Sequence, residues 1–183
     1  MDSGEEKLSN QAKARKLNLR LMETYQSKDK HGQAYFRSNF VCRELERKIW
    51  EEILNEIPKF TPDTYKVGSI EVKTPRLVFA YSNTGLKYQY SGNVRSTQSW
   101  LPSLEILRDQ IQPFCSHPLN FALVNVYRNL NDSIGWHSDE EAIVSGSDIA
   151  SFSLRATRNF QVKGRYQNTG MLVISISLTT ASW

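Results

Sequence analysis

The stretch from residue 121 to residue 141 restricts the fold of this chain more than any other part of the sequence. It opens with an apolar run, Phe121–Tyr127, which predicts a β-strand. A polar turn follows over residues 129–133, and Gly135 then gives the backbone additional freedom. Two side chains that can bind a metal, His137 and Asp139, come directly after the turn. The sequence therefore predicts a strand that ends at a loop with two potential metal ligands.

His137 and Asp139 are separated by a single residue. On an extended backbone, residues i and i+2 point the same way, so the pair can offer an imidazole and a carboxylate to one ion. Such a pair makes up two thirds of the 2-His-1-carboxylate triad, which binds Fe(II) and leaves coordination positions open. The structural alternative is a solvated loop whose polar residues carry no chemistry.

Asn125 and Tyr127 alternate with apolar Val124 and Val126 within the predicted strand. Two polar groups therefore share one side of an otherwise apolar strand. One interpretation is a half-exposed strand with a solvated face. The other is that the two side chains line a pocket and hydrogen-bond an acidic cosubstrate.

Composition sets the class of protein. A chain of 183 residues, 39% hydrophobic and 23% charged, is typical of one soluble domain. No apolar run approaches the ~18 residues of a membrane span, and no secretory signal opens the chain, so we expect no membrane association. The two cysteines, Cys42 and Cys115, make no disulfide framework, which favours a reducing compartment. We expect a monomer in the nucleus, the cytoplasm or both.

The charge distribution is compatible with a polyanionic partner. The net charge is +4 with a pI near 9.1, and no acidic residue occurs between Ile149 and Trp183. A basic strip of this kind would suit a phosphate-tracking surface, although an ordinary solvated strand face is the alternative. Its cations are Arg155, Arg158, Lys163 and Arg165.

Apolar spacing predicts two helices and several short strands. The first helix, about 42–57, has apolar residues at helical spacing that include Trp50 in the core, and Pro58 ends it. The second, 104–112, is entered through Pro102 and a Ser103 cap. We interpret residues 1–33, which precede both helices, as a polar extension. The expected strands are 34–41 (or a turn), 70–72, 77–81, 86–90, 149–152, 157–162 and 171–177, besides 121–127.

Four motifs follow one another along the chain: Tyr88-Gln-Tyr90-Ser91-Gly92, Asn125-x-Tyr127, Trp136-His137-Ser-Asp139-Glu-Glu141 and Ala150-Ser-Phe-Ser-Leu-Arg-Ala-Thr-Arg158-Asn-Phe160. Their order resembles that of the AlkB-type Fe(II)/2-oxoglutarate dioxygenases, most closely the branch of eukaryotic DNA/RNA repair demethylases. The resemblance runs from about Pro75 to the end of the chain.

The resemblance implies an α+β, mostly β fold: a double-stranded β-helix (a cupin-like jelly roll) that the two helices brace from outside. The domain would occupy 34–183 after the 1–33 extension, with a nucleotide-recognition lid at about 66–100. The implied activity is oxidative demethylation of N-alkylated bases in DNA or RNA, as in the repair of alkylation damage. The implied partner is alkylated nucleic acid.

The resemblance also implies the cofactors and the roles of individual residues. His137, Asp139 and a further histidine would bind Fe(II), while Asn125 and Tyr127 would hydrogen-bond 2-oxoglutarate. O2 would be the oxidant, with ascorbate as an accessory reductant, and the hydroxylated alkyl group would leave as an aldehyde. An enzyme that acts on a base must flip it out of the stack and hold it between side chains. The implied substrate contacts are Tyr88, Tyr90, Arg95, Trp136, Glu141 and Arg158.

Purely structural alternatives exist for these substrate contacts. In these alternatives the two tyrosines pack a sheet, Glu141 is an exposed loop acid, and Arg158 forms a structural salt bridge. A zinc-binding cupin-like domain would use the same ligands without 2-oxoglutarate. A protein or lipid substrate is a further option, against which the Tyr88-x-Tyr90-Ser-Gly motif argues.

The sequence departs from the family pattern beyond Trp183. The family pattern places the third metal ligand, a histidine, and two arginines after a tryptophan that resembles Trp183, and one arginine clamps 2-oxoglutarate. Without them we expect weak iron and cosubstrate binding, missing C-terminal strands and exposed sheet edges. The chain is then either a truncated form, fragment or splice product of a normal enzyme, or a catalytically inactive pseudoenzyme that binds nucleic acid.

Overall fold

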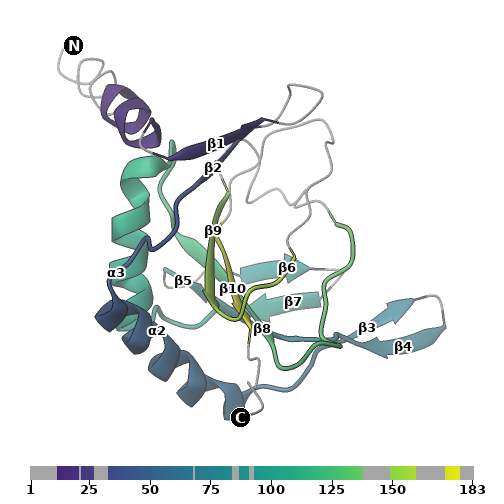
Figure 1. The fold of residues 1–183 in the computed structure, drawn as a ribbon. Coiled ribbons are helices and arrows are strands. Elements are labelled where there is room, and N and C mark those ends of the chain that lie inside the picture. The colour runs from purple at the N-terminus through teal and green to yellow at the C-terminus, as the bar shows by residue number, and fades with distance from the viewer. Residues whose placement is uncertain are drawn as a thin grey trace, which may run out of the picture.

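The computed structural model describes residues 12–20, 22–26, 33–67, 69–83, 87–90, 93–137, 149–159 and 172–177 (Figure 1). At 25–26, 33, 66–67, 88–90, 93–95 and 172–177 only the backbone is described. Helices and strands are both well represented, which makes the fold α+β, as predicted.

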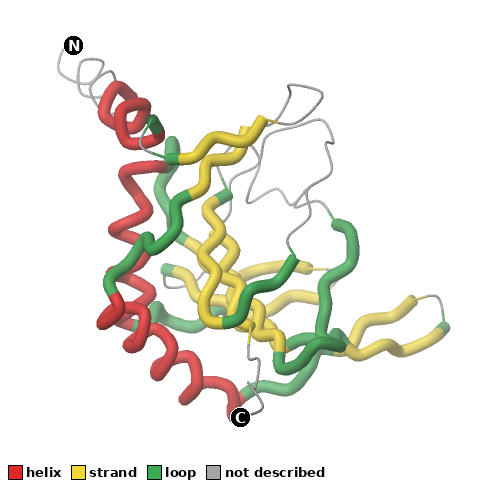
Figure 2. The backbone as a smooth tube through the Cα atoms, in the orientation of Figure 1, coloured by secondary structure: helices red, strands yellow, loops and turns green. Residues whose placement is uncertain are grey.

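A four-stranded sheet forms the centre of the molecule (Figure 2). Its strand order is β5-β8-β10-β9, so the strand expected to organise the chain, β8, lies between two neighbours. β5 runs antiparallel to β8, whereas β10 runs parallel to both β8 and β9. The strands span Leu77–Ser82 (β5), Phe121–Tyr127 (β8), Ala150–Arg155 (β9) and Leu172–Ser177 (β10).

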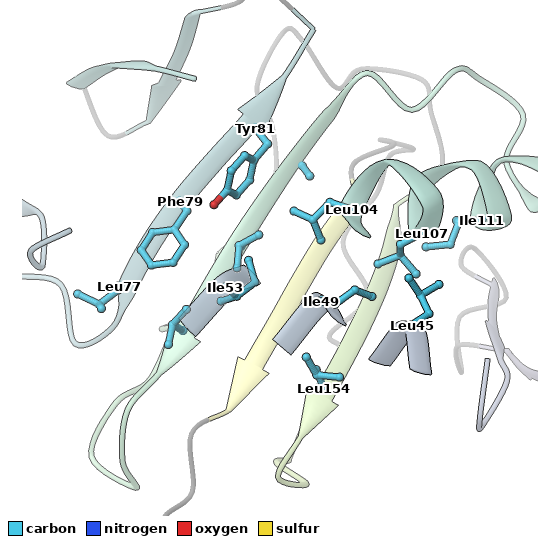
Figure 3. Close-up of a cluster of buried hydrophobic side chains, with 13 residues drawn as sticks. Leu45, Ile49, Ile53, Leu77, Phe79, Tyr81, Leu104, Leu107, Ile111 and Leu154 are labelled. Carbon is cyan, nitrogen blue, oxygen red and sulfur yellow. The ribbon is translucent and has the colours of Figure 1, made fainter. Parts of the chain in front are cut away.

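Two helices, α2 (Arg43–Glu56) and α3 (Pro102–Ile111), cover one face of this sheet. Their buried leucines and isoleucines are three or four residues apart and so form one stripe on each helix. Each such side chain contributes about 1.5–3 kcal/mol when it leaves water. Figure 3 shows the stripes against the sheet. The core residues include Leu45, Ile49, Ile53, Leu77, Phe79, Leu104, Leu107, Ile111 and Leu154.

The helix ends agree with the prediction at α2 and differ at α3. α2 runs into a 3-10 turn, Ile57–Lys59, that contains Pro58. α3 begins at Pro102, because proline is favoured at the first helical position, and Leu101 is the N-cap residue. The expected cap at Ser103 is therefore wrong. Ser103 instead donates from N (3.1 Å) and Oγ (2.7 Å) to Glu52 of α2, which ties the two helices together.

Three antiparallel hairpins surround the main sheet. The expected lid range of 66–100 contains one of them, β6–β7, but also β5, which is part of the main sheet. Of the hairpin strands, β1, β3 and β7 were not predicted, since each is short and mostly polar. The pairs are β1 (Glu23–Gln26) with β2 (Gln33–Phe36), β3 (Thr64–Val67) with β4 (Ile70–Lys73), and β6 (Lys87–Tyr90) with β7 (Asn93–Ser96).

Part of the expected N-terminal extension contacts the domain. Residues 12–19 are helical, and the Nε of Arg15 donates to the carbonyl of Phe114 at 3.0 Å. β1 also pairs with β2 across the expected boundary at residue 33. The division into 1–33 and 34–183 stays a prediction.

The described strands do not by themselves make a double-stranded β-helix. Jelly rolls are antiparallel throughout, whereas both pairings of β10 are parallel. The strand expected at 157–162 is wrong for residues 157–159, which form a loop, and its other half lies outside the described residues. In the described part of the chain, no helix is long and apolar enough to cross a membrane.

Candidate functional site

The site is built at the end of β8, where the central strand gives way to the loop that carries His137. All seven residues of β8 are buried, so the half-exposed strand is not what the structure shows. Val124 and Val126 face the helices as part of the core. By strand alternation, Asn125 and Tyr127 belong to the opposite face, and they are 1% and 7% exposed.

Asn125 has a partner that the sequence analysis did not assign. Its Oδ1 accepts a hydrogen bond of 2.7 Å from the Nε of Arg76, a guanidinium that is itself buried. The antiparallel register pairs Leu77 with Val126, so Arg76 comes opposite Tyr127 where β5 begins. An arginine directly before a buried strand is the signal that could have pointed to it. Because Oδ1 is the acceptor, the Nδ2 group of Asn125 is the donor that a ligand carboxylate would use.

Arg158 lies beside Tyr127, in the loop after β9 and not on a strand as expected. Its guanidinium carbon is 4.6 Å from the centre of the Tyr127 ring, a cation–π contact. Nη1 donates to the carbonyl of Asn129 at 3.1 Å, and Nη2 donates to the carbonyl of Asp132. These contacts join the loops that follow β8 and β9.

Arg128 and Asp132 close the loop after β8 on itself. The buried Asp132 carboxylate accepts from the backbone N (2.8 Å), Nε (2.8 Å) and Nη2 (3.0 Å) of Arg128. Burial by itself would raise the pKa of the Asp132 carboxyl. The hydrogen bonds and charge of Arg128, together with the charge of Arg158, outweigh burial and hold that pKa below its ordinary value. The carboxylate is therefore ionised and firmly bound.

His137 lies at the end of the same loop and is exposed. Its Nδ1 is 2.8 Å from the carbonyl oxygen of Gly135. A carbonyl can only accept, so this contact places the ring proton on Nδ1 and leaves Nε2 with the lone pair that a metal needs. Imidazole nitrogen is a ligand that Fe(II) takes, and this donor fits the group expected here. Trp136 beside it is 58% exposed.

Several predicted site residues are described in part or not at all. Asp139 and Glu141 lie outside the described residues. In the β6–β7 hairpin, Tyr88 pairs with Arg95 and Tyr90 pairs with Asn93. Alternation puts Tyr88 and Tyr90 on one face of β6. Among the described residues, no three His, Cys, Asp or Glu side chains form a group that could hold a metal.

The expected basic strip is partly engaged in contacts within the protein. The guanidinium carbon of Arg155 is 4.6 Å from the ring centre of Trp50 on α2, and Arg158 contacts Tyr127. Lys163 and Arg165 lie outside the described residues. These contacts give the two described cations a role within the fold.

Comparison with known proteins decides the family. The model of the 2OG-Fe(II) oxygenase superfamily matches residues 33–182, which is most of the chain. This chain belongs to that superfamily, as an oxygenase of the AlkB type.

Relatives of this oxygenase carry names that agree with the assignment. It is 32% identical to DNA oxidative demethylase ALKBH2 of Bos taurus over 143 residues, covering 74% of this chain and 51% of the relative. Identity with the Mus musculus protein of the same name is 37% over 62% of this chain and 48% of the relative. Alpha-ketoglutarate-dependent dioxygenase alkB homolog 3 of Mus musculus is 37% identical over 66% of this chain and 42% of the relative. The chain spans about half the length of the curated relatives it matches.

The superfamily is one of dioxygenases that depend on Fe(II), 2-oxoglutarate and O2. In this oxygenase, the described residues that fit such a centre are His137 as an imidazole ligand and Asn125 as a buried donor beside a guanidinium. Both belong to one continuous segment, β8 and its loop.

Proposed function

We propose that this protein oxidatively demethylates N-alkylated bases in DNA or RNA, and that the end of β8 is its active site. One observation carries the proposal. The buried central strand brings Asn125, Tyr127 and the His137 loop to one edge of the sheet, in a chain whose relatives are named as oxidative demethylases.

At this site, His137 and Asp139 would hold Fe(II) together with a further histidine. When bound, the iron and 2-oxoglutarate supply the oxidising chemistry, which hydroxylates the alkyl carbon with O2. The protein's residues bind and orient. The Nδ1 contact of His137 with Gly135 fixes the ring tautomer, and the Arg76–Asn125 hydrogen bond fixes the amide that would face the cosubstrate.

The substrate would bind against the β6–β7 hairpin. Tyr88 and Tyr90 share one face of β6, as two aromatics that hold a flipped base would. Arg95, opposite Tyr88, is suited to a phosphate. Trp136, which is exposed, would complete the rim together with Glu141, which lies outside the described residues.

The finer fold assignment belongs to the same proposal. We infer that β5 and β8 form part of one wall of a double-stranded β-helix, as the superfamily implies. The antiparallel β5–β8 pair is the part of the described sheet that fits such a wall, whereas the parallel pairings of β10 do not fit it.

A demethylation assay tests the activity. Oligonucleotides with methylated bases would be incubated with Fe(II), 2-oxoglutarate and O2, and both the repaired base and the released formaldehyde would be quantified. The proteins compared are this chain, any natural form that continues past Trp183, His137→Ala, and His117→Ala as a matched control. His117 is an exposed histidine that precedes β8, whereas His137 follows the other end of the strand.

We expect product from at least one natural form and from its His117→Ala variant, and none when His137→Ala is introduced into the same form. If no natural form makes product while all variants bind the oligonucleotide equally, the protein is a nucleic-acid-binding module and the proposal is wrong.

A further inference from the structure

We propose that Arg158 is a positioning residue for His137: it clamps the loop after β8 and thereby sets the place of the metal ligand, instead of contacting the nucleic acid. The inference rests on the proposed function only in taking His137 as the iron ligand.

The contacts of Arg158 all belong to β8 and its loop. Nη1 and Nη2 donate to two backbone carbonyls of the loop, those of Asn129 and Asp132, while the guanidinium plane lies near the Tyr127 ring. Arg158 is half-buried in this position. These two hydrogen bonds use one N–H of each terminal nitrogen, and together with the ring contact they hold the guanidinium against the loop after β8.

The backbone before Arg158 turns sharply toward the loop. Arg155, the last residue of β9, has a φ of 71°, in the left-handed region that non-glycine residues seldom adopt. The register aligns Arg155 and Tyr127 with the same residue of β10, Ser177, so β8 and β9 end at the same level of the sheet. The turn therefore returns the chain to the loop that leaves β8.

The loop after β8 makes further contacts besides those with Arg158. Asp132 binds Arg128 within the loop. The amide of Ser133 donates to the carbonyl of Pro75 at 2.9 Å, ahead of β5. His137 follows Ser133 by four residues, and such a segment reaches at most ~14 Å when extended. A shift of the clamped residues is thus passed on to His137.

Arginine suits this position because its planar fork presents parallel N–H donors to two acceptors at once. A lysine keeps the charge and the contact with the aromatic ring, but its single ammonium cannot reproduce the fork. Arg158→Lys should therefore fall between the wild type and Arg158→Met. Arg155→Met is the matched control, since it removes a guanidinium that also lies over an aromatic ring but contacts α2.

NMR of the 183-residue chain can test the clamp without turnover. The sequence has only three histidines, His31, His117 and His137, so their ring cross-peaks are few, and His137→Ala identifies the one of interest. Amide hydrogen exchange at Asp132 and Ser133 reports on the loop, because both amides are hydrogen-bonded there. Exchange at the buried Val124 reports on the fold as a whole.

In Arg158→Met we expect exchange at Asp132 and Ser133 to be at least about 10-fold faster, with Val124 unchanged, since the loss of the two hydrogen bonds to the loop allows local opening. The His137 cross-peak should shift while that of His117 stays in place. Arg155→Met should behave like the wild type at all these positions. If Arg158→Met is unfolded, Arg158→Lys supplies the same comparison with a smaller effect. Wild-type exchange and an unmoved His137 peak in a folded Arg158 variant would overturn the clamp.

A titration with Mn(II), a paramagnetic substitute for Fe(II), separates the clamp from the proposed function. Mn(II) should broaden the His137 peak of the wild type, and Arg158→Met should need about 10-fold more metal, as for other residues that orient a ligand. A wild-type His137 peak that Mn(II) does not broaden would contradict the iron site. The hydrogen-exchange data alone would then test the positioning role of Arg158. Equal Mn(II) requirements in the wild type and Arg158→Met would overturn the positioning role.

Discussion

Asp132 shows how one buried carboxylate can hold a functional loop. It is 4% exposed, and Arg128 supplies three hydrogen bonds to it. A group whose pKa is lower in the folded state stabilises the protein above its ordinary pKa. That stability is lost as the pH falls below the ordinary value of 3.8 and through the folded-state pKa.

We therefore predict a pH-dependent effect of Asp132→Asn. Near neutral pH the variant should lose about 1–3 kcal/mol of unfolding free energy, because the charge-assisted hydrogen bonds of Arg128 are weakened. Well below the ordinary carboxyl pKa the difference should shrink, since a protonated Asp132 resembles asparagine. Urea unfolding followed by circular dichroism at both pH values measures it.

Asp109→Asn is the matched control, because that carboxylate bonds a neighbouring arginine while 67% of its side chain is exposed. It should cost less than about 0.5 kcal/mol, as is usual for surface substitutions. A loss in Asp132→Asn that is the same at both pH values would contradict the assigned role of the carboxylate.

At the level of single residues, the sequence indicated candidate site residues more readily than the contacts between them. The strand pattern was enough to single out Asn125 and Tyr127. It did not supply the Arg76 partner of Asn125, because that pairing depends on the register of two strands 49 residues apart in sequence. The contacts of Arg158 could not be predicted either, since they join two irregular loops and leave no periodic signal.

At the level of elements, the tie between α2 and α3 is a polar contact within an otherwise apolar interface. Ser103 is 1% exposed, and its hydroxyl donates to Glu52 across the two helices. Ser103→Ala should destabilise the protein by about 1–2 kcal/mol, because one donor to a partly buried carboxylate is lost. Thermal unfolding measures this loss.

The exposed Ser153 of β9 provides the control for that change. Ser153→Ala should leave the melting temperature nearly unchanged. If the two variants melt together, the Ser103–Glu52 contact adds nothing to the packing of the helices.

The elements themselves followed from the sequence to differing degrees. The bounds of β8 were predicted correctly, and those of α2 to within one residue, because a continuous apolar run and a helical stripe are strong local signals. The strands β1, β3 and β7 were missed, because their short and mostly polar sequences carry too little apolar pattern. The parallel contacts of β10 depend on the whole sheet and have no local signature.

At the level of the whole molecule, the central strand joins stability and function. One face of β8 is packed against α2 and α3, and the other presents Asn125 and Tyr127 next to buried Arg76. The core that fixes the strand thus also fixes the site. Family membership and this arrangement together make β8 and its loop the place where iron and cosubstrate should bind.

The most direct test of this account is calorimetry of 2-oxoglutarate binding under anaerobic conditions, with and without Fe(II), on the wild type, His137→Ala and His117→Ala. In any natural form that binds 2-oxoglutarate, we predict that binding requires Fe(II), is retained in His117→Ala and is at least about 10-fold weaker in His137→Ala. Binding that is equally strong in His137→Ala, or independent of Fe(II), would contradict the placement of the oxygenase centre at the end of β8.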